Sequence, residues 1–248
     1  AKDSFIEHTQ QEYIILGLFY GILVIMIVYN LFLYISLRMK AYLYYVLLII
    51  TSMIAQLSLN GLAFEYIWPE LPAWNKQAVS FWVGISCILI ILFTKEFLDT
   101  NKHIPGFRLF SFVLIGFNLL MMSFLYIDHY IALNLMLVST FLTFSSAIGV
   151  TVLSLRRGVR EARFLILGWT IFLGGVFITI LQRTAVIPHS VFSEYAGQGA
   201  LALQIALLSI ALADKINIMR QEKSEAERLA RESQELALQS LKKADELK

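Results

Sequence analysis

The stretch YIILGLFYGILVIMIVYNLFLYISL, residues Tyr13–Leu37, contains no Asp, Glu, Lys or Arg. A helix needs about 20 apolar residues to cross a hydrocarbon layer about 30 Å thick, and this stretch exceeds that length. Hydrophobic residues make up 58% of the whole chain, so such stretches are predicted to span a membrane. Six further stretches share this character: Ala41–Phe64, Gln77–Thr94, Leu109–Ile127, Tyr130–Leu155, Phe164–Gln182 and Tyr195–Ala213. We therefore predict an all-α membrane protein with a seven-transmembrane helix bundle over residues 13–213.

The segment after Ala213 has a different composition. Residues 214–248 are mostly Glu, Lys, Arg, Gln, Ala and Leu, without Pro or Gly. This composition is typical of a long solvated helix or a coiled coil. Because no Gly or Pro follows Gly199, we expect one continuous helix from about Tyr195 to beyond Leu241. The predicted fold is thus a membrane bundle that continues into a C-terminal cytoplasmic coiled-coil helix.

The basic residues in the connections predict which end of the bundle faces the cytoplasm, because Lys and Arg are retained on that side. The connections after the first, third and fifth spans hold nine of them: Arg38, Lys40, Lys95, Lys102, Arg108, Arg156, Arg157, Arg160 and Arg163. The opposite side holds three: Lys2, Lys76 and Arg183. We therefore expect a multi-pass protein of the bacterial inner membrane, with a periplasmic N-terminus and a cytoplasmic C-terminus.

Composition and motifs argue against several other functions. The net charge is only +2, and the inner connections account for it, so we expect no nucleic-acid partner. The single Cys87 cannot form a disulfide framework or a metal cluster, and the four histidines fall in loops or in the N-terminal tail. We expect no catalytic site, no metal and no cofactor. A retinal protein would need a lysine within its last span, but the stretch Tyr195–Ala213 has none.

Several motifs of the membrane part resemble a known family. They are the run Tyr29–Tyr34, the basic turn through Arg38 and Lys40, the aromatic cluster Tyr42–Tyr45, and the segment Leu59–Pro69. These residues are similar to bacterial seven-transmembrane receptors with diverse intracellular signalling modules (7TMR-DISM). In that family a periplasmic carbohydrate-binding-like domain usually precedes the bundle, and a histidine kinase, diguanylate cyclase or phosphatase follows it.

The resemblance implies a function and partners. We expect a transmembrane signal-transduction module that relays a periplasmic or membrane signal to a cytoplasmic output enzyme, most simply a histidine kinase, because Lys243–Lys248 resembles the stretch before a phosphoacceptor helix. Residues 1–12 would then be a periplasmic linker from a missing sensor domain. One alternative is a receptor whose bundle itself binds a small or lipidic molecule and is coupled to a diguanylate cyclase or phosphatase. A transporter is a third possibility. The expected partners are membrane lipids, the missing sensor and kinase domains, and a second copy of this chain.

Polar, uncharged side chains supply candidates for a ligand pocket. Ser52, Gln56 and Asn60 recur every four residues and so share one helix face, which opens toward the outer side. They could line a pocket, or they could form hydrogen bonds between helices in lipid, which is the commoner role. At the outer end, Arg183 could pair with an acid or receive an anionic ligand, or extend to the head groups. The full set of pocket candidates is Ser52, Gln56, Asn60, Glu65, Gln182, Arg183 and Gln198.

Small residues predict close helix contacts. Gly17 and Gly21 form a GxxxG step, which favours either a contact inside the bundle or a dimer face, and seven helices offer many internal neighbours. Gly174 and Gly175, with the segment Ala196–Ala200, offer further small surfaces.

The C-terminal segment is the candidate for signal coupling. Its apolar residues follow a three-four spacing that continues only after a four-residue insertion, a pattern typical of a stuttered coiled coil. An isolated single helix is the alternative, because polar residues such as Ser233 interrupt the seam. The residues assigned to this signal-coupling helix are Asp214, Met219, Leu229, Leu236 and Leu241. We expect the helix to mediate a parallel homodimer.

Overall fold

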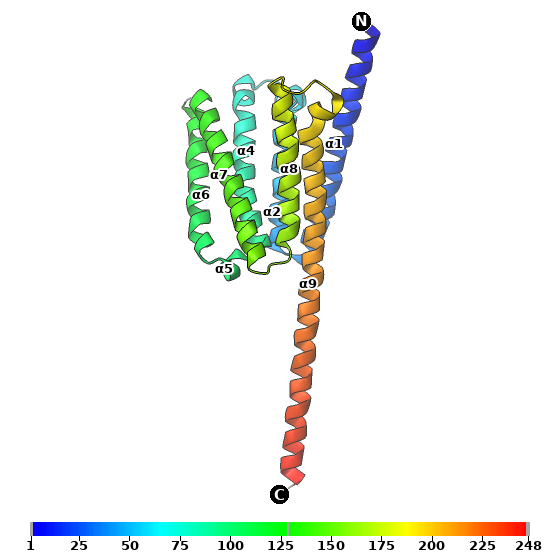
Figure 1. The fold of residues 1–248 in the computed structure, drawn as a ribbon, viewed down its shortest axis with the longest axis vertical. Helices are drawn as coiled ribbons and strands as arrows, with labels where there is room; N and C mark the ends of the chain where they lie inside the picture. Colours follow the sequence, from blue (N-terminus) through cyan, green and yellow to red (C-terminus); the bar gives the residue numbers. More distant parts are fainter. Residues whose placement is uncertain (1, 128, 247–248) are drawn as a thin grey trace.

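The computed structural model describes residues 2–127 and 129–246, and helices are the only regular elements in that part of the chain (Figure 1). In order they are α1 (Lys2–Leu37), α2 (Lys40–Leu59), α3 (Leu62–Tyr66), α4 (Pro72–Phe97), α5 (Thr100–His103), α6 (Gly106–Ser123), the 3-10 turn η1 (Phe124–Tyr126), α7 (His129–Arg156), α8 (Ala162–Arg183) and α9 (Val191–Glu246). Seven of these described helices, namely α1, α2, α4, α6, α7, α8 and α9, are long and apolar enough to cross a membrane. The predicted all-α seven-transmembrane class is confirmed.

Several boundaries differ from the predicted spans, and two of the differences have a clear local cause. The second span was predicted to continue to Phe64, but α2 ends at Leu59 and the chain restarts as α3. Gly61 has a φ of 77°, a left-handed conformation that glycine adopts without a steric cost and that ends the helix. The third span was predicted to begin at Gln77, but α4 begins at Pro72, because proline fits the first turn of a helix, where its missing N–H is not needed.

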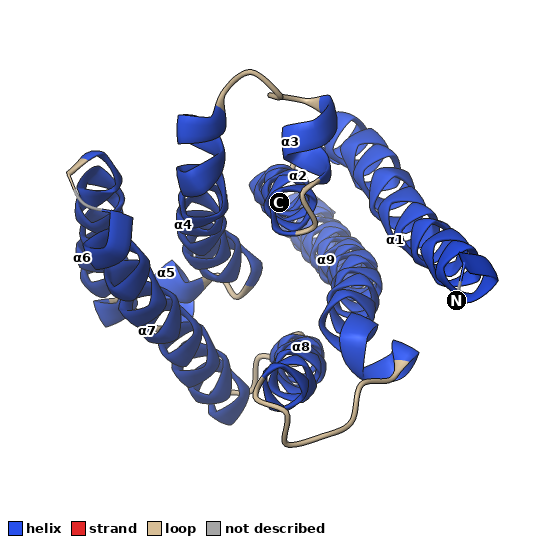
Figure 2. Cartoon of the chain, turned by 90° about the horizontal axis from the view of Figure 1, so that it is seen from above, coloured by secondary structure: helices blue, strands red, loops and turns tan. Residues whose placement is uncertain are grey.

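Five of the long helices surround a central space, and two lie outside them. Figure 2 shows α2, α4, α7, α8 and α9 around the centre, with α1 and α6 at opposite flanks. The flanking α1 contacts α2 and α9, whereas α6 contacts α4 and α7. We call the end of the bundle from which α9 extends the inner end, and the opposite end the outer end. Consecutive spans alternate in direction, so the nine basic residues of the odd-numbered connections lie together at the inner end.

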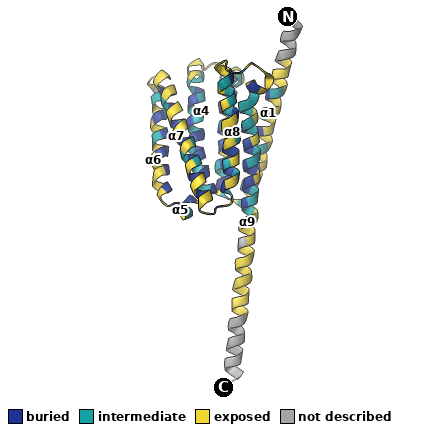
Figure 3. Cartoon of the chain, in the orientation of Figure 1, coloured by how far each residue is buried: buried dark blue, intermediate teal, exposed yellow. Residues whose placement is uncertain are grey.

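The core has many of its largest fully buried side chains toward the inner end. Its largest fully buried side chains include Tyr42 and Tyr45 early in α2, Phe93 and Phe97 late in α4, and Leu165 early in α8. All of these positions lie in the inner halves of their helices. The outward faces of the bundle are exposed and rich in large apolar side chains, as Figure 3 shows for α6 and α7. In a membrane these faces would contact acyl chains.

Buried polar side chains join helices to one another. The hydroxyl of Ser209 on α9 donates to the Asn30 side chain on α1 at 3.1 Å. On the other side of the bundle, Ser139 of α7 donates to Asn118 of α6 at 2.7 Å, and Asn118 donates to Thr143 of α7 at 3.3 Å. Such bonds hold helices together in lipid, where apolar contacts add little specificity.

The glycines divide into a packed and an unpacked set. A β-carbon on Gly175 of α8 would lie 2.2 Å from the Ala200 β-carbon and 2.6 Å from the Ala196 carbonyl oxygen, so α8 and α9 approach closely there. By contrast, a β-carbon on Gly17 or Gly21 would meet nothing within 4 Å. The expectation that these two glycines contact another helix of the bundle is wrong, because α1 lies at the flank and turns this face outward.

The last helix is the longest. The prediction of one continuous helix from about Tyr195 to beyond Leu241 is confirmed, because α9 runs without interruption from Val191 to Glu246. Its first part packs against α8 and contacts α1 and α2, and its second part extends away from the bundle (Figure 1).

Candidate functional site

A cavity of about 410 Å³ lies at the centre of the bundle, between α2, α4, α7, α8 and α9. This volume falls within the usual range of small-molecule sites, about 300–1,000 Å³. Two predicted pocket residues, Ser52 and Gln56, line the cavity from α2. Most of the remaining lining is aliphatic or aromatic, including Leu48, Phe141 and Trp169. The arrangement provides an apolar chamber with a few polar groups.

Asn60 has a different environment from Ser52 and Gln56. It follows the last residue of α2 and is not among the residues that line the cavity. Its side-chain amide donates to the Tyr20 hydroxyl on α1 at 2.8 Å, and its side-chain oxygen accepts from Gln198 of α9 at 3.1 Å. Asn60 thus joins three helices at the outer end, and the predicted pocket residue Gln198 takes part in the same hydrogen-bonded group.

The remaining pocket candidates lie at the outer end, apart from the cavity. Glu65 is exposed on α3, where its carboxylate raises the pKa of the adjacent Tyr66 phenol above the usual value of 10.0. Gln182 is buried, and its amide lies 2.6 Å from Nδ1 of His189. Arg183 is exposed and forms no ion pair within residues 2–127 and 129–246. The geometry therefore does not bring these three residues together with Ser52 and Gln56.

Sequence reasoning missed three polar residues of the cavity, namely Ser86, Thr140 and Gln204. Gln204 of α9 lines it and is only 5% exposed, yet its side chain forms no hydrogen bond to another described residue. Across from it, Gly168 of α8 leaves room for its aliphatic stem. The available signal was an amide in the middle of an otherwise apolar span, since intramembrane polar residues are often functional.

A second site lies where α9 leaves the bundle. Lys215 is almost fully buried, and its ammonium donates to the Phe97 carbonyl at 2.6 Å and to the Glu96 carbonyl at 3.3 Å. It also forms an ion pair with Asp99 at 3.0 Å. Both carbonyls belong to the last turn of α4, where a cation satisfies unpaired carbonyls and the negative end of the helix dipole. We call this group of Lys215, Asp99 and the two carbonyls the α4–α9 clasp.

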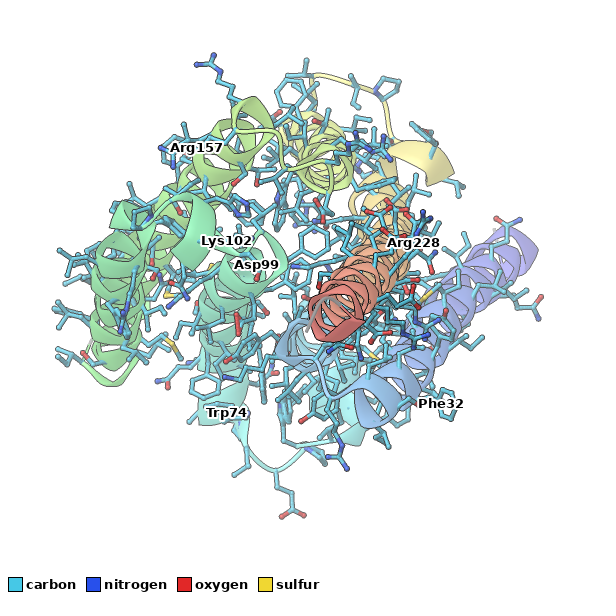
Figure 4. The ribbon with its side chains drawn as sticks, turned by 90° about the horizontal axis from the view of Figure 1, so that it is seen from below. Phe32, Trp74, Asp99, Lys102, Arg157 and Arg228 are labelled. Atoms are coloured by element: carbon cyan, nitrogen blue, oxygen red, sulfur yellow. The ribbon has the colours of Figure 1, made fainter. Side chains whose placement is uncertain are left out.

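Further charged contacts surround the clasp. The predicted coupling residue Asp214 pairs with Arg163 of α8 at 3.8 Å, so α9 is tied to α8 as well as to α4. A polar cavity of about 360 Å³ borders the clasp, and the predicted coupling residue Met219 is among its lining residues. Lys102 and Arg157 also line it, and Figure 4 shows both from the inner end, with Asp99 nearby.

The family model described as "7TM diverse intracellular signalling" matches residues 12–215. The chain belongs to this family. The matched range starts in α1 and ends at Lys215, the residue that fastens α9 to the inner end of α4. No curated protein and no solved structure matches the chain.

In this 7TM signalling protein, the segment after the family domain is solvated as far as its side chains are described. Leu229 is 65% exposed, although it was predicted to lie in a coiled-coil seam. In a single chain, a residue of a coiled-coil seam has no partner helix to cover it. The exposure of Leu229 therefore fits both a lone helix and one helix of a coiled coil. The side chains of Leu236 and Leu241 lie outside the described ones.

Proposed function

We propose that this chain is the transmembrane relay of a sensor histidine kinase in the bacterial inner membrane, with its N-terminus in the periplasm and its tail in the cytoplasm. A signal from a periplasmic sensor domain, or from the bundle itself, changes the packing of α9. The change then passes along α9 to a kinase attached to its end. The relay acts by conformational coupling and carries out no chemistry of its own.

The observation that carries this proposal is the continuity of α9. One helix spans residues 191–246, so a rotation or shift imposed within the bundle is transmitted to its far end. The family domain matches up to Lys215, and the helix continues beyond it. The α4–α9 clasp and the Arg163–Asp214 pair fasten the helix at its exit point, where a small movement must pass.

The proposal includes a parallel homodimer through the tail, since kinases of this kind act as dimers and Leu229 presents an exposed apolar side chain. The tail's charged residues are spread along it and form pairs within the helix, such as Arg228 with Glu232 at 2.9 Å. Such pairs keep the tail soluble and leave the apolar positions for a partner helix.

The test rotates the end of α9 relative to the bundle, with a kinase attached to that end. The catalytic core of a histidine kinase is fused after Lys248, and one to seven alanines are inserted after Arg231 in the full chain. Each added residue rotates the distal helix by about 100°. Seven alanines nearly restore the original phase and serve as the matched control for two, which rotate the end by about 200°.

We expect autophosphorylation in proteoliposomes to follow this phase. The seven-residue insertion should stay within about twofold of the unmodified fusion, whereas the two-residue insertion should change the rate by about fivefold or more, equivalent to about 1 kcal/mol. Rates that fall steadily with insertion length, without recovery at seven, would show that the end of α9 does not carry a phase-dependent signal.

A further inference from the structure

The central cavity opens sideways. In Figure 1, α7 lies beside α8 near the inner end and diverges from it toward α6 at the outer end. Residues that line the cavity on these two helices are exposed: Leu137 is 69% and Phe141 71% exposed on α7, and Leu173 is 38% exposed on α8. These positions lie within apolar spans, so the opening faces membrane hydrocarbon instead of water. A molecule dissolved in the bilayer can therefore reach the cavity.

The lining restricts what could bind. None of the described residues that line the cavity is Asp, Glu, Lys, Arg or His, so a charged group would be buried without a counter-charge, at a large desolvation cost. The cavity reaches from Leu59 at the end of α2 to Tyr45, fourteen residues deeper, which corresponds to about 21 Å along the helix. One leaflet of hydrocarbon is about 15 Å thick, so the cavity is longer than one leaflet and has the length to hold a lipid chain.

The cavity also contains polar groups without partners. Gln204 is 5% exposed, and its amide makes no hydrogen bond to another described residue. An amide in an apolar cavity gains from a hydrogen-bond partner, and a ligand hydroxyl or carbonyl would supply one. Ser52 and Gln56 also line the cavity without a side-chain hydrogen bond to a described residue, so they offer further positions for a polar group.

We propose that the cavity binds an uncharged, membrane-soluble amphiphile that has one long apolar chain and a hydrogen-bonding end group such as a hydroxyl or an ester. The ligand enters between α7 and α8 from the hydrocarbon layer, and its polar end is held by Gln204. Its chain contacts the aromatic and aliphatic lining. The inference rests on the proposed function in one respect: ligand occupancy of the cavity would supply the stimulus that the relay transmits. Binding itself requires no output enzyme.

Fluorescence quenching of Trp169 tests this site directly. Trp169 lines the cavity and is 2% exposed, so a quencher reaches it only from within the cavity. The full chain, with its other tryptophans replaced by phenylalanine (W68F, W74F and W82F), is reconstituted into nanodiscs. The probe is 9,10-dibromo-octadecanol, whose bromines quench only at contact. We expect saturable quenching that unbrominated octadecanol reverses, and about tenfold weaker binding of dibromostearate, whose carboxylate is charged.

Three variants locate the site. Ser52→Phe fills the cavity and should weaken binding by about tenfold, a loss of about 1.4 kcal/mol. Gln204→Leu should weaken it by about three- to tenfold, the range expected for one hydrogen bond. The matched control is Leu47→Phe, on the lipid-facing side of the same helix as Ser52, which should bind within about twofold of the parent, since Leu47 is exposed and outside the lining.

Melting temperatures distinguish a variant that has lost the binding site from one that has lost its fold. Replacing an unpartnered amide by an apolar group of similar size is neutral or stabilising, so Gln204→Leu should melt at the same temperature or higher while binding less. Quenching that rises linearly without saturation would overturn the proposal, as would equal quenching by a dibrominated phosphatidylcholine, which would indicate non-specific filling by bilayer chains. Unchanged probe affinity in Gln204→Leu would also overturn it. Because no kinase is present, a failure of the relay cannot imitate any of these results.

Discussion

The α4–α9 clasp yields the sharpest prediction, which is that replacing Lys215 by methionine frees α9 from the inner end of α4. Methionine keeps a long unbranched side chain that can occupy the same buried space. It removes the donor to the Phe97 and Glu96 carbonyls and the charge that faces Asp99. The last turn of α4 then loses both its hydrogen-bond donor and its neutralising cation.

The contacts give the size of the effect. A hydrogen bond to a charged group contributes about 1.5–3 kcal/mol, and the 2.6 Å bond to Phe97 is well formed whereas the 3.3 Å contact to Glu96 is long. The Asp99 side chain is 59% exposed, so solvent screening reduces its ion pair to about 0.5–1 kcal/mol. We therefore expect Lys215→Met to lower the free energy of local opening by about 3 kcal/mol, and Asp99→Asn by about 0.5–1 kcal/mol.

Amide hydrogen exchange of residues 213–219 in nanodiscs measures this opening. A change of about 3 kcal/mol corresponds to exchange about 100-fold faster, and Asp99→Asn should accelerate it by about two- to fivefold. The control is Lys223→Met, which removes only an exposed pair with Glu227 at 3.9 Å and should change exchange by about twofold or less. Exchange in Lys215→Met within about twofold of the parent would refute the clasp. An effect of Asp99→Asn as large as that of Lys215→Met would show that the ion pair, not the carbonyls, holds α9.

Three further predictions concern orientation, helix packing and the tail. A cysteine placed at Arg157 should resist an impermeant thiol reagent added outside intact cells, and strong labelling there would reverse the assigned orientation. Gly175→Leu should destabilise the chain by about 3 kcal/mol or more in thermal unfolding because it pushes α8 from α9. At Gly174 an added β-carbon meets nothing within 4 Å, so Gly174→Leu should change the stability by about 0.5 kcal/mol at most, and equal effects would disprove the close contact. A cysteine at Leu229 should cross-link to its own copy while one at Arg231 does not, and equal cross-linking would exclude a fixed coiled-coil seam.

The fold could be predicted from the sequence because the bilayer imposes a simple rule. A span must be long, apolar and helical, so uncharged stretches locate the seven helices, and the absence of Gly and Pro after Gly199 predicts the continuity of α9. The prediction failed where a single residue decides the local conformation. Gly61 ends α2 by adopting a left-handed conformation, and nothing in the hydropathy of Ala41–Phe64 signals that turn.

The candidate sites were only partly predictable, since spacing along one helix says which residues share a face and not what lies opposite. Ser52 and Gln56 were found because they repeat every four residues, and they do line the cavity. Asn60 continues the same repeat but lies beyond the end of α2, where it joins α1 and α9. The clasp of Lys215 with α4 connects residues more than a hundred positions apart, and such a pairing has no signal in one sequence.

The central cavity and the α4–α9 clasp lie on one helix, so we expect a movement at one to reach the other. Leu201, Gln204 and Leu208 of α9 line the central cavity, and Lys215 follows Leu208 by seven residues, about 10 Å along the same helix. Between them Leu212 of α9 is fully buried, so this segment cannot bend without disrupting its packing contacts. A ligand that displaces α9 at Gln204 must therefore move it as a rigid unit, and the clasp is the next contact that this movement has to strain or break. Ligand occupancy should accordingly accelerate amide exchange at residues 213–219, and occupancy without any change there would separate the cavity from the relay.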